Sequence, residues 1–318
     1  MAEEKYMQTI AITNFGGSEC LTSMHLPIPT PDQNEVLLRV QAAGVGLWDV
    51  KVRQGGATLP GQQFPLILGW ESAGIIEQVG SNVTEWHVGD AVMSFTYQAG
   101  IGHYAEYVAV PANLVAAAPN SVDALHVAAL PVNGLTAYQT LTEALALRAG
   151  ETILITAASG TTGGFAVQLA ARMRAHVIAV ASAHNHAYLS ELGASELIDY
   201  TQTDIVAAVH ATHSEGIDAV LDCVGGKTAA SCLETLRNGG RMVSIVDLER
   251  VKPRQGVKAD IFYVRPDGKQ LSELAHLVDT RQLSISLDSV FPLEKAQQAH
   301  QRLEGQHNRG KIVLNVQQ

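Results

Sequence analysis

The sequence predicts an α/β protein with two domains, one doubly wound around a parallel sheet and one rich in β-strands. A short apolar, β-branched run at 151–156 passes through a glycine-rich turn into a helical pattern. Strand-like and helical segments then alternate, whereas short strands fill the first third of the chain. The length of 318 residues also exceeds what one hydrophobic core usually serves.

The first region, up to about residue 118, consists of short strand-like runs separated by loops. Gly and Pro mark the loops, and Pro111 stops the last run. This pattern is typical of a separate barrel-like or sandwich domain. The predicted strands cover residues 9–13, 35–42, 74–79, 91–95 and 104–110.

A helical pattern follows over residues 122–147, where Pro131 should kink or restart the helix. The alternating region then ends with a turn at 238–240 and a strand at 241–246. The closing strand at 310–316 has no βα partner, so we expect it to return to the first domain. We therefore predict a β-rich domain from residues 1–120 and 261–318, and a doubly wound domain from residues 121–260.

The glycine-rich turn has the features of an anion-binding site. Gly160, Gly163 and Gly164 allow close backbone approach, and the following helix directs its unpaired N–H groups and positive dipole end into the turn. Ala158 replaces the first glycine of G-x-G-x-x-G, and a turn without a ligand would explain the short motif alone. The strands and helices downstream favour a dinucleotide site. We expect a Cβ at Gly163 to weaken pyrophosphate binding before it affects folding.

The cofactor preference is predicted from the end of the second strand of this domain. An NAD site usually places Asp or Glu about 20 residues beyond the glycines. No acidic residue stands between Glu151 and Glu191, and the strand end carries Ser182 and His184. We expect NADP(H), because a 2′-phosphate would be tolerated there, although neither Lys nor Arg stands at this strand end.

Composition excludes several classes of function. The net charge of −10 argues against a nucleic-acid partner, and no apolar run approaches the length of a membrane span. The charged N-terminus does not fit a signal peptide, and three scattered cysteines fit neither a disulfide framework nor zinc spacing. The twelve histidines include close pairs, but these lack Cys or acidic ligands at fixed spacing, so we predict no metal site. We expect a cytoplasmic protein.

Short motifs, ordered along nearly the whole chain, indicate a family. They are the segments 44–55, 68–74, 88–92, 105–108, 130–138, 155–170, 192–194, 198–200, 239–241 and 309–313. Each motif alone is weak, but their number and order are specific. Through them the chain resembles the medium-chain dehydrogenase/reductase superfamily.

The resemblance implies a Rossmann domain and a GroES-like catalytic domain completed by the C-terminal segment. Zinc-dependent members have His between the residues matching Gly69 and Glu71, where this chain has Trp70. They also have Cys near the segment 44–49, where this chain has none, and a four-cysteine lobe that this chain lacks. Without imidazole and thiolate, no tetrahedral catalytic zinc site can form there. The chain is therefore similar to the zinc-independent quinone-oxidoreductase-like branch, whose members use NADPH to reduce quinones or α,β-unsaturated carbonyls.

The resemblance also implies a set of cofactor-binding residues and a homodimer with a small-molecule substrate. Thr136 matches a position near the nicotinamide, and we expect Asn133, which lies just before it, to share this role; Val224 and Ile245 match strand ends that line the cofactor. The pyrophosphate and 2′-phosphate positions are matched by Gly160, Thr161, Thr162, Gly163, Ser182 and Tyr200, and the strand end adds His184 as a further candidate. The family often has Asn where this chain has Gly46 and Tyr where it has Lys51, which leaves the substrate open.

Hydride transfer itself demands no dedicated base, because the protein supplies position, dryness and donors for the developing negative charge. The candidates for a proton donor are Tyr97, Lys51 and Asp49. A loop aromatic, a solvated lysine and a helix cap would explain the same three residues without catalysis. A zinc-free alcohol dehydrogenase and a nucleotide-binding protein without activity stay open as alternatives.

Overall fold

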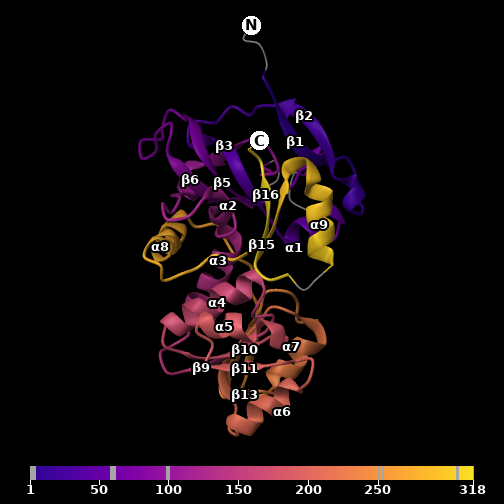
Figure 1. Ribbon diagram of the computed structural model, residues 1–318, viewed down its shortest axis with the longest axis vertical. Helices are drawn as coiled ribbons and strands as arrows, with labels where there is room; N and C mark the ends of the chain where they lie inside the picture. Colours follow the sequence, from indigo (N-terminus) through magenta and orange to yellow (C-terminus); the bar gives the residue numbers. More distant parts are fainter. Residues whose placement is uncertain are drawn as a thin grey trace. The chain divides into compact units, whose positions relative to one another are not determined.

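The computed structural model describes residues 5–57, 62–97, 101–249, 251–252, 254–305 and 308–317. Most of the charged N-terminal segment that does not fit a signal peptide lies outside the described residues. The chain forms two compact units, one of Met1–Leu135 with Arg265–Gln318 and one of Thr136–Val264. The ends of the chain share the first unit, as the indigo and yellow ribbons in Figure 1 show. Among the described residues no helix is both long and apolar enough to cross a membrane.

The first unit is built on a seven-stranded sheet whose centre is β3 (Glu35–Val45). This strand pairs antiparallel with β5 (Glu71–Val79), with β7 (Tyr107–Pro111) and with β16 (Lys311–Asn315). Ile312 of β16 lies opposite Val45, so the C-terminal strand completes this sheet. The prediction that the tail returns to the first domain is confirmed.

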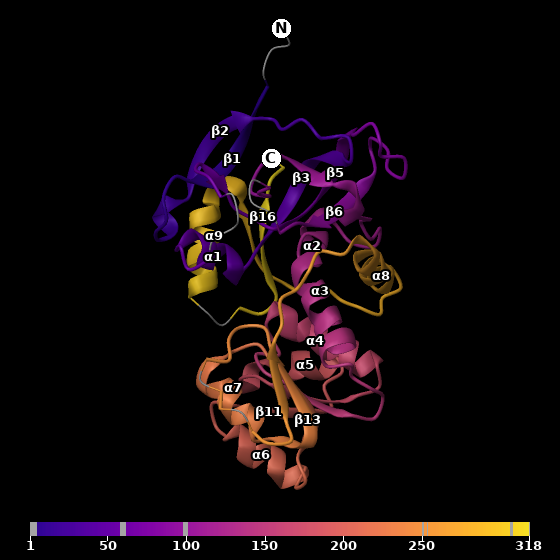
Figure 2. The same cartoon turned by 180° about the vertical axis from the view of Figure 1, so that it is seen from behind.

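The remaining strands of the first unit either complete this sheet (β6, β8 and β15) or form the smaller sheet β2-β1-β4. Figure 2 shows α9 beside α1, and α8 lies against β8. The strands are β1 (Tyr6–Ile12), β2 (Thr22–Pro27), β4 (Leu66–Ile67), β6 (Ala91–Phe95), β8 (Val115–Ala117) and β15 (Leu287–Pro292). The helices are α1 (Leu47–Arg53), α2 (Ala124–Val127), α8 (Gly268–Asp279) and α9 (Ala296–Glu304), and α3 (Pro131–Gln139) begins here and ends in the second unit.

The second unit is a six-stranded parallel sheet in the order β11-β10-β9-β12-β13-β14. The strand order reverses between β9 and β12, and right-handed crossovers then place the helices on both faces. Ligands of such sheets bind at the carboxyl ends beside this reversal. The strands are β9 (Thr152–Ile155), β10 (His176–Val180), β11 (Glu196–Ile198), β12 (Ile217–Asp222), β13 (Leu236–Ser244) and β14 (Lys258–Ile261). The helices are α4 (Thr161–Arg172), α5 (His186–Glu191), α6 (Ile205–Thr212) and α7 (Gly226–Leu233).

The predicted fold class is confirmed, and two local predictions have definite outcomes. Pro131 does restart the helical region, since α3 begins at this residue. The turn predicted at 238–240 is wrong, because these residues lie inside β13. The pairing of β13 with β12 shifts there, from Leu236 opposite Ile217 to Arg241 opposite Ala219. The glycines therefore form a bulge, which a left-handed Gly239 with a φ of +80° permits.

The predicted borders at 120 and 260 remain proposals for the limits of independently folding domains. Helix α2, which follows residue 120, packs on β3 and β5 of the first unit.

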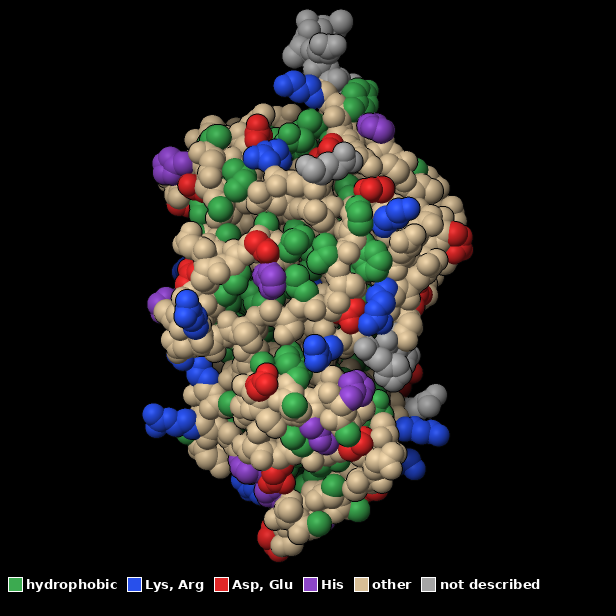
Figure 3. Space-filling view, viewed as in Figure 1, with side chains coloured by type: hydrophobic (Ala, Val, Ile, Leu, Met, Phe, Trp, Pro, Cys, Tyr) green, Lys and Arg blue, Asp and Glu red, His purple; other side chains and the backbone are tan. Residues whose placement is uncertain are grey.

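On the face drawn in Figure 3, basic and acidic side chains are interspersed rather than gathered in one basic field.

Candidate active site

The glycine-rich turn connects the carboxyl end of β9 to the amino end of α4. Gly160 is the residue before the first helical position, and the first turn of α4 contains no acidic side chain. The first N–H groups of an α-helix have no acceptor within the helix, and together with the dipole they favour an anion. Thr161 and Thr162 occupy the first two helical positions, so the turn can hold a pyrophosphate on backbone donors.

Gly163 makes a close backbone contact within the fold, in addition to the cofactor role that the sequence suggested. A Cβ on Gly163 would lie 2.4 Å from the carbonyl oxygen of Ala157 and 2.7 Å from the Cα of Ala158, whereas a Cβ on Gly160 would lie 3.3 Å from its nearest neighbour. The backbone of α4 thus contacts the backbone of the turn at Gly163, which is where dinucleotide folds need a glycine for helix–strand packing. The expectation that a larger residue at Gly163 spares the fold is therefore corrected.

Ser182 and His184 lie beside the glycine-rich turn, joined to it through Asn185. The Asn185 side-chain amide donates to Ser159 Oγ at 3.2 Å and also lies 3.2 Å from His184 Nε2. If the amide donates both bonds, His184 carries its proton on Nδ1 and donates it to Ser182 Oγ, 3.1 Å away. This pattern leaves the hydroxyl proton of Ser182 for a ligand.

Tyr200 and Asp199 follow β11 on the neighbouring strand. Tyr200 is half exposed, with a relative accessibility of 48%. Asp199 accepts hydrogen bonds from Thr201, which lower the pKa of its carboxyl, with a further contribution from the backbone of Ala183. The sequence argument considered only the end of β10 and missed this carboxylate, which belongs to the same edge of the sheet.

Val224 lies two residues beyond the carboxyl end of β12, and Ile245 directly follows that of β13. Both are positioned by Asp222, a fully buried carboxylate that accepts hydrogen bonds from the hydroxyls of Thr156 at 2.9 Å and Ser244 at 2.8 Å. Asp222 also accepts from the N–H of Val224 and, through its own carbonyl, from the N–H of Ile245. This network fixes three adjacent strand ends, and the sequence analysis did not single it out.

In the first unit a buried ion pair joins β5 to β16. Lys311 Nζ lies 2.5 Å from Glu71 Oε1 and donates to Asn133 Oδ1 at 2.7 Å. The second oxygen of Glu71 accepts the N–H of Val132 at 2.7 Å. Glu71 and Lys311 are only 2% and 3% exposed. Asn133 is thus fixed by a cation, while Thr136, one turn further along α3, is buried in the second unit.

Asp49 is buried in the first turn of α1 and is surrounded by donors. Its Oδ2 accepts the N–H of Gly46 at 2.7 Å and the hydroxyl of Tyr104 at 3.2 Å, and its Oδ1 accepts the N–H of Gly69 at 3.1 Å. Burial raises the pKa of Asp49 to about 7, against the lowering effect of these hydrogen bonds and of Lys311. These contacts make Asp49 a positioning residue for the Gly46 and Gly69 segments.

A directional chain of hydrogen bonds runs from Asp49 to the C-terminal helix α9. Arg53 can only donate, so its contact of 3.1 Å with His300 Nδ1 places the proton of this ring on Nε2. His300 Nε2 then donates to Tyr104 Oη at 3.2 Å, and Tyr104 donates to Asp49. Burial and the guanidinium of Arg53 lower the pKa of His300 to about 3, which agrees with a neutral ring. Glu304 pairs with Arg53 at 2.8 Å.

An aromatic group lies where the zinc-dependent relatives carry metal ligands. The Tyr97 ring centroid is 5.9 Å from that of Trp48 and 5.6 Å from that of Trp70, and Lys51 Nζ is 5.6 Å from the Trp48 ring centroid. Two of the three predicted proton donors, Tyr97 and Lys51, therefore flank Trp48, and both are exposed. Among the described residues, the buried Nε1 donors of Trp48 and Trp70 have no hydrogen-bond acceptor.

Comparison with known families agrees with this architecture. Residues 32–120 match the alcohol dehydrogenase GroES-like domain, and residues 192–314 match a model described as zinc-binding dehydrogenase. The chain is 32% identical to a chloroplast envelope quinone oxidoreductase homolog of Arabidopsis thaliana, over 98% of each chain. It belongs to the medium-chain dehydrogenase/reductase superfamily, in the quinone-oxidoreductase-like branch.

Solved structures show the same similarity. The quinone oxidoreductase from Coxiella burnetii matches with a TM-score of 0.88 and 30% identity, covering 98% of this chain and 100% of that one. The Escherichia coli quinone oxidoreductase, solved as a complex with NADPH, matches with a TM-score of 0.87 and 26% identity, covering 97% of this chain and 100% of that one. The chain is accordingly an NAD(P)H-dependent oxidoreductase with a small-molecule substrate.

Proposed function

We propose that the protein transfers a hydride from NADPH to a quinone or an α,β-unsaturated carbonyl compound without a catalytic metal. The observation that carries this proposal is the aromatic group of Trp48, Trp70 and Tyr97, with its two buried indole N–H donors. Such a group can stack on a flat conjugated ring and donate to a carbonyl oxygen. Among the described residues of the first unit, no three His, Cys, Asp or Glu side chains gather as metal ligands.

Residues of the second unit support the proposal that NADPH is the cofactor. The amino end of α4 receives the pyrophosphate on the N–H groups of its first turn, which begins at Thr161, while the N–H of Gly160 donates to the carbonyl of Ala157 and so holds the turn closed. Val224 and Ile245, held by Asp222, line the path of the cofactor at the reversal of strand order. When bound, the dihydronicotinamide supplies the hydride.

The first unit positions the acceptor and supplies the proton that completes the reduction. The indole donors hold the carbonyl oxygen on which negative charge develops, and preorganised donors of this kind stabilise such charge. The phenol of Tyr97 is half exposed and its ring lies beside both indoles at tilted angles of 50° and 47°, so we assign it the proton transfer to the reduced product, with the exposed Lys51 as a neighbouring cation. Asp49 positions the Gly46 and Gly69 segments and is not the proton donor in this proposal.

A preference for NADPH over NADH is part of this proposal. The hydroxyl proton of Ser182 and the exposed phenol of Tyr200 can donate to a 2′-phosphate, while His184 orients the Ser182 hydroxyl through its own N–H. The carboxylate of Asp199 on the neighbouring strand opposes this preference. Two variants distinguish the donors that favour a 2′-phosphate from the carboxylate that opposes it. Ser182→Asp adds a negative charge beside the phosphate, and Asp199→Asn removes one.

Fluorescence titration of both cofactors tests the preference. We expect NADPH to bind more tightly than NADH to the natural protein, Asp199→Asn to widen the ratio and Ser182→Asp to invert it. Ser182→Asp should shift the ratio by about tenfold or more, because it places a like charge beside the 2′-phosphate. Equal affinities in the natural protein would reject the preference.

Replacement of the indole donors tests the substrate class. We expect Trp70→Phe to raise the KM for a benzoquinone or an enone by about three- to tenfold, the value of one lost hydrogen bond, while the affinity for NADPH is unchanged. Trp86→Phe is the matched control, because the indole of Trp86 donates to the carbonyl of Ala112 instead. An equal KM in Trp70→Phe and the natural protein would show that this donor does not hold the substrate.

The two alternatives make different predictions for the same assay. A zinc-free alcohol dehydrogenase would oxidise alcohols with NADP⁺ faster than it reduces a quinone or an enone. A nucleotide-binding protein without activity would bind NADPH and leave every acceptor unchanged.

We also propose a homodimer located in the cytoplasm. The relatives include proteins named as chloroplastic and mitochondrial, so the location needs its own test. Light scattering on the purified chain and fractionation of the source cells would decide these two points.

A further inference from the structure

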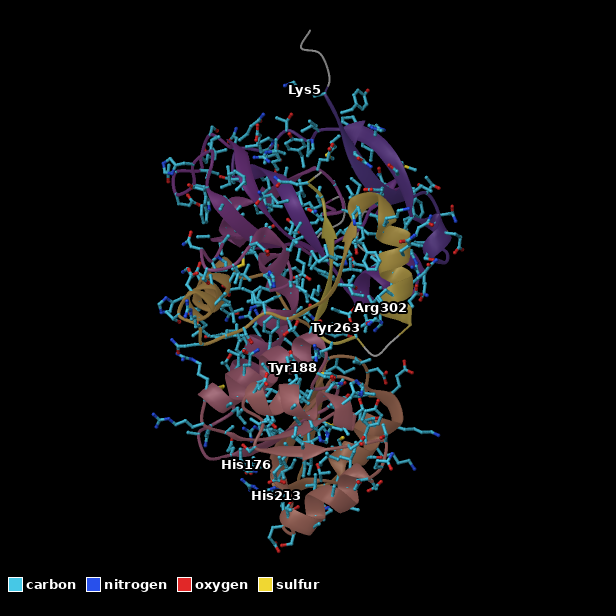
Figure 4. The ribbon with its side chains drawn as sticks, in the orientation of Figure 1. Lys5, His176, Tyr188, His213, Tyr263 and Arg302 are labelled. Carbon is cyan, nitrogen blue, oxygen red and sulfur yellow. The ribbon has the colours of Figure 1, made fainter. Side chains whose placement is uncertain are left out.

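Three side chains that are distant in sequence meet at one edge of the second unit. His176 is the first residue of β10, Glu196 is the first residue of β11, and His213 caps the end of α6. Ile178 pairs with Glu196 in the parallel ladder, and the period of two puts His176 on the same face as Ile178. Helix α6 packs its buried side on this face, and its last turn brings His213 to the other two. Figure 4 shows His176 and His213 close together.

The contacts among the three are short and involve the atoms that bind metals. Glu196 Oε1 lies 2.6 Å from His176 Nε2 and 2.8 Å from His213 Nε2. The two imidazole rings lie 5.7 Å apart in an edge arrangement. The other oxygen, Oε2, accepts the hydroxyl of Thr212 at 3.2 Å, which directs Oε1 towards the histidines. The candidate ligand atoms all lie within 4.8 Å of one another.

This geometry needs only a small opening to hold a metal ion. Bonds of about 2.0–2.1 Å at tetrahedral angles separate ligand atoms by about 3.3 Å. The two nitrogen–oxygen distances would therefore increase by roughly half an ångström. The histidine side chains are 41% and 21% exposed and Glu196 is 31% exposed, so an ion can enter and keep water ligands while three backbone-anchored side chains hold it.

In place of the sequence-based prediction of no metal site, which did not foresee that Glu196 joins two histidines, we propose that His176, Glu196 and His213 bind one divalent transition-metal ion of the Zn²⁺ type. Two imidazoles and one carboxylate suit Zn²⁺, Co²⁺ and Ni²⁺, whereas Mg²⁺ and Ca²⁺ prefer oxygen ligands. Without the ion both Nε2 atoms donate their protons to Glu196 Oε1; on binding, each ring gives up its Nε2 proton, carries its remaining proton on Nδ1 and presents Nε2 to the ion. The ion would connect the last turn of α6 to β10 and β11 and so stabilise the second unit.

The site is separate from the proposed reaction. It lies at the amino ends of β10 and β11, whereas the glycine-rich turn follows the carboxyl end of β9 in the same parallel sheet. A five-residue strand separates the two edges by about 15 Å. Binding should therefore leave NADPH affinity and turnover unchanged, and this proposal does not depend on the proposed function.

Titration of the chelator-treated full chain with Zn²⁺, Ni²⁺ and Mg²⁺, by calorimetry and by thermal melting, tests the site. We expect one Zn²⁺ per chain with micromolar affinity, a rise in Tm of roughly 5 °C at a hundredfold excess over Kd, and no response to Mg²⁺. His213→Gln and His176→Gln, which keep side-chain size and hydrogen bonding, should each weaken Zn²⁺ binding at least tenfold. Glu196→Gln should do the same.

His210→Gln is the matched control, because His210 lies on the same helix but contacts the carbonyl of Glu234. Its Zn²⁺ affinity should equal that of the natural chain. Absence of stoichiometric Zn²⁺ binding, or equal affinity in the His176 and His213 variants, would overturn the proposal and leave a hydrogen-bonded cluster only. Equal binding of Mg²⁺ would overturn the assigned metal class.

Discussion

The two units hold their proposed functional residues in different ways. The second unit uses a close backbone contact at Gly163 and a carboxylate, Asp222, whose partners are uncharged hydroxyl and N–H groups at the ends of adjacent parallel strands. The first unit uses charged side chains from distant parts of the chain, such as Glu71 with Lys311 and Asp49 with Tyr104. From this difference we expect steric substitutions to lower the stability of the second unit most, and changes of charge or pH to lower the stability of the first unit most.

Removal of the charge on Lys311 is expected to have the largest effect. Lys311→Met leaves Glu71 buried without its cation, and breaking a buried pair in this way costs about 3–5 kcal/mol of unfolding free energy. Arg39→Met is the matched control, because the Arg39–Glu77 pair is exposed and worth less than about 1 kcal/mol. Urea unfolding of both variants measures the difference. Equal losses would show that the buried pair does not hold the first unit together.

Enlargement of Gly163 is the corresponding steric change in the second unit. We expect Gly163→Val to lower the unfolding free energy by about 2–4 kcal/mol, because its Cβ meets backbone atoms that cannot move independently. Gly160→Ala should cost much less stability. Thermal melting with and without NADPH separates the two positions. A Gly163→Val protein with a natural Tm would restore the view that this glycine serves the cofactor alone.

The pH dependence at Asp49 is a finer test. Its pKa in the folded protein, about 7, is higher than the ordinary value of 3.8, so the folded state binds the extra proton between these values. Stability contributed by this group is therefore present at low pH and is lost as the pH rises from about 4 to 7, by about 1.4 kcal/mol per pH unit at most. Asp49→Asn should remove this slope. Parallel stability profiles for the variant and the natural protein would contradict the raised pKa.

Local patterns predicted the fold class and the glycine-rich turn, because strand and helix periodicity and glycine spacing are properties of neighbouring residues. The contact of Arg53 with His300 spans 247 positions, and that of His176 with Glu196 spans 20, so neither leaves a local signal. Asp199 was missed because only one strand end was considered. The Gly239 bulge was missed because a pair of glycines usually indicates a turn. Here the neighbouring strand β12 pairs with residues on both sides of the glycines, and this pairing keeps them inside β13.

NADPH oxidation by the chelator-treated protein, with a benzoquinone or an enone as acceptor, tests the central claim most directly. The absorbance of NADPH reports each turnover, and the reaction is run with Trp70→Phe and Trp86→Phe beside the natural protein. We expect chelation to leave the rate unchanged, the acceptor to be reduced in equal amount to the NADPH consumed, and only Trp70→Phe to raise the KM for the acceptor. Loss of activity on chelation that added Zn²⁺ restores, or NADPH binding without reduction of any acceptor, would contradict the account.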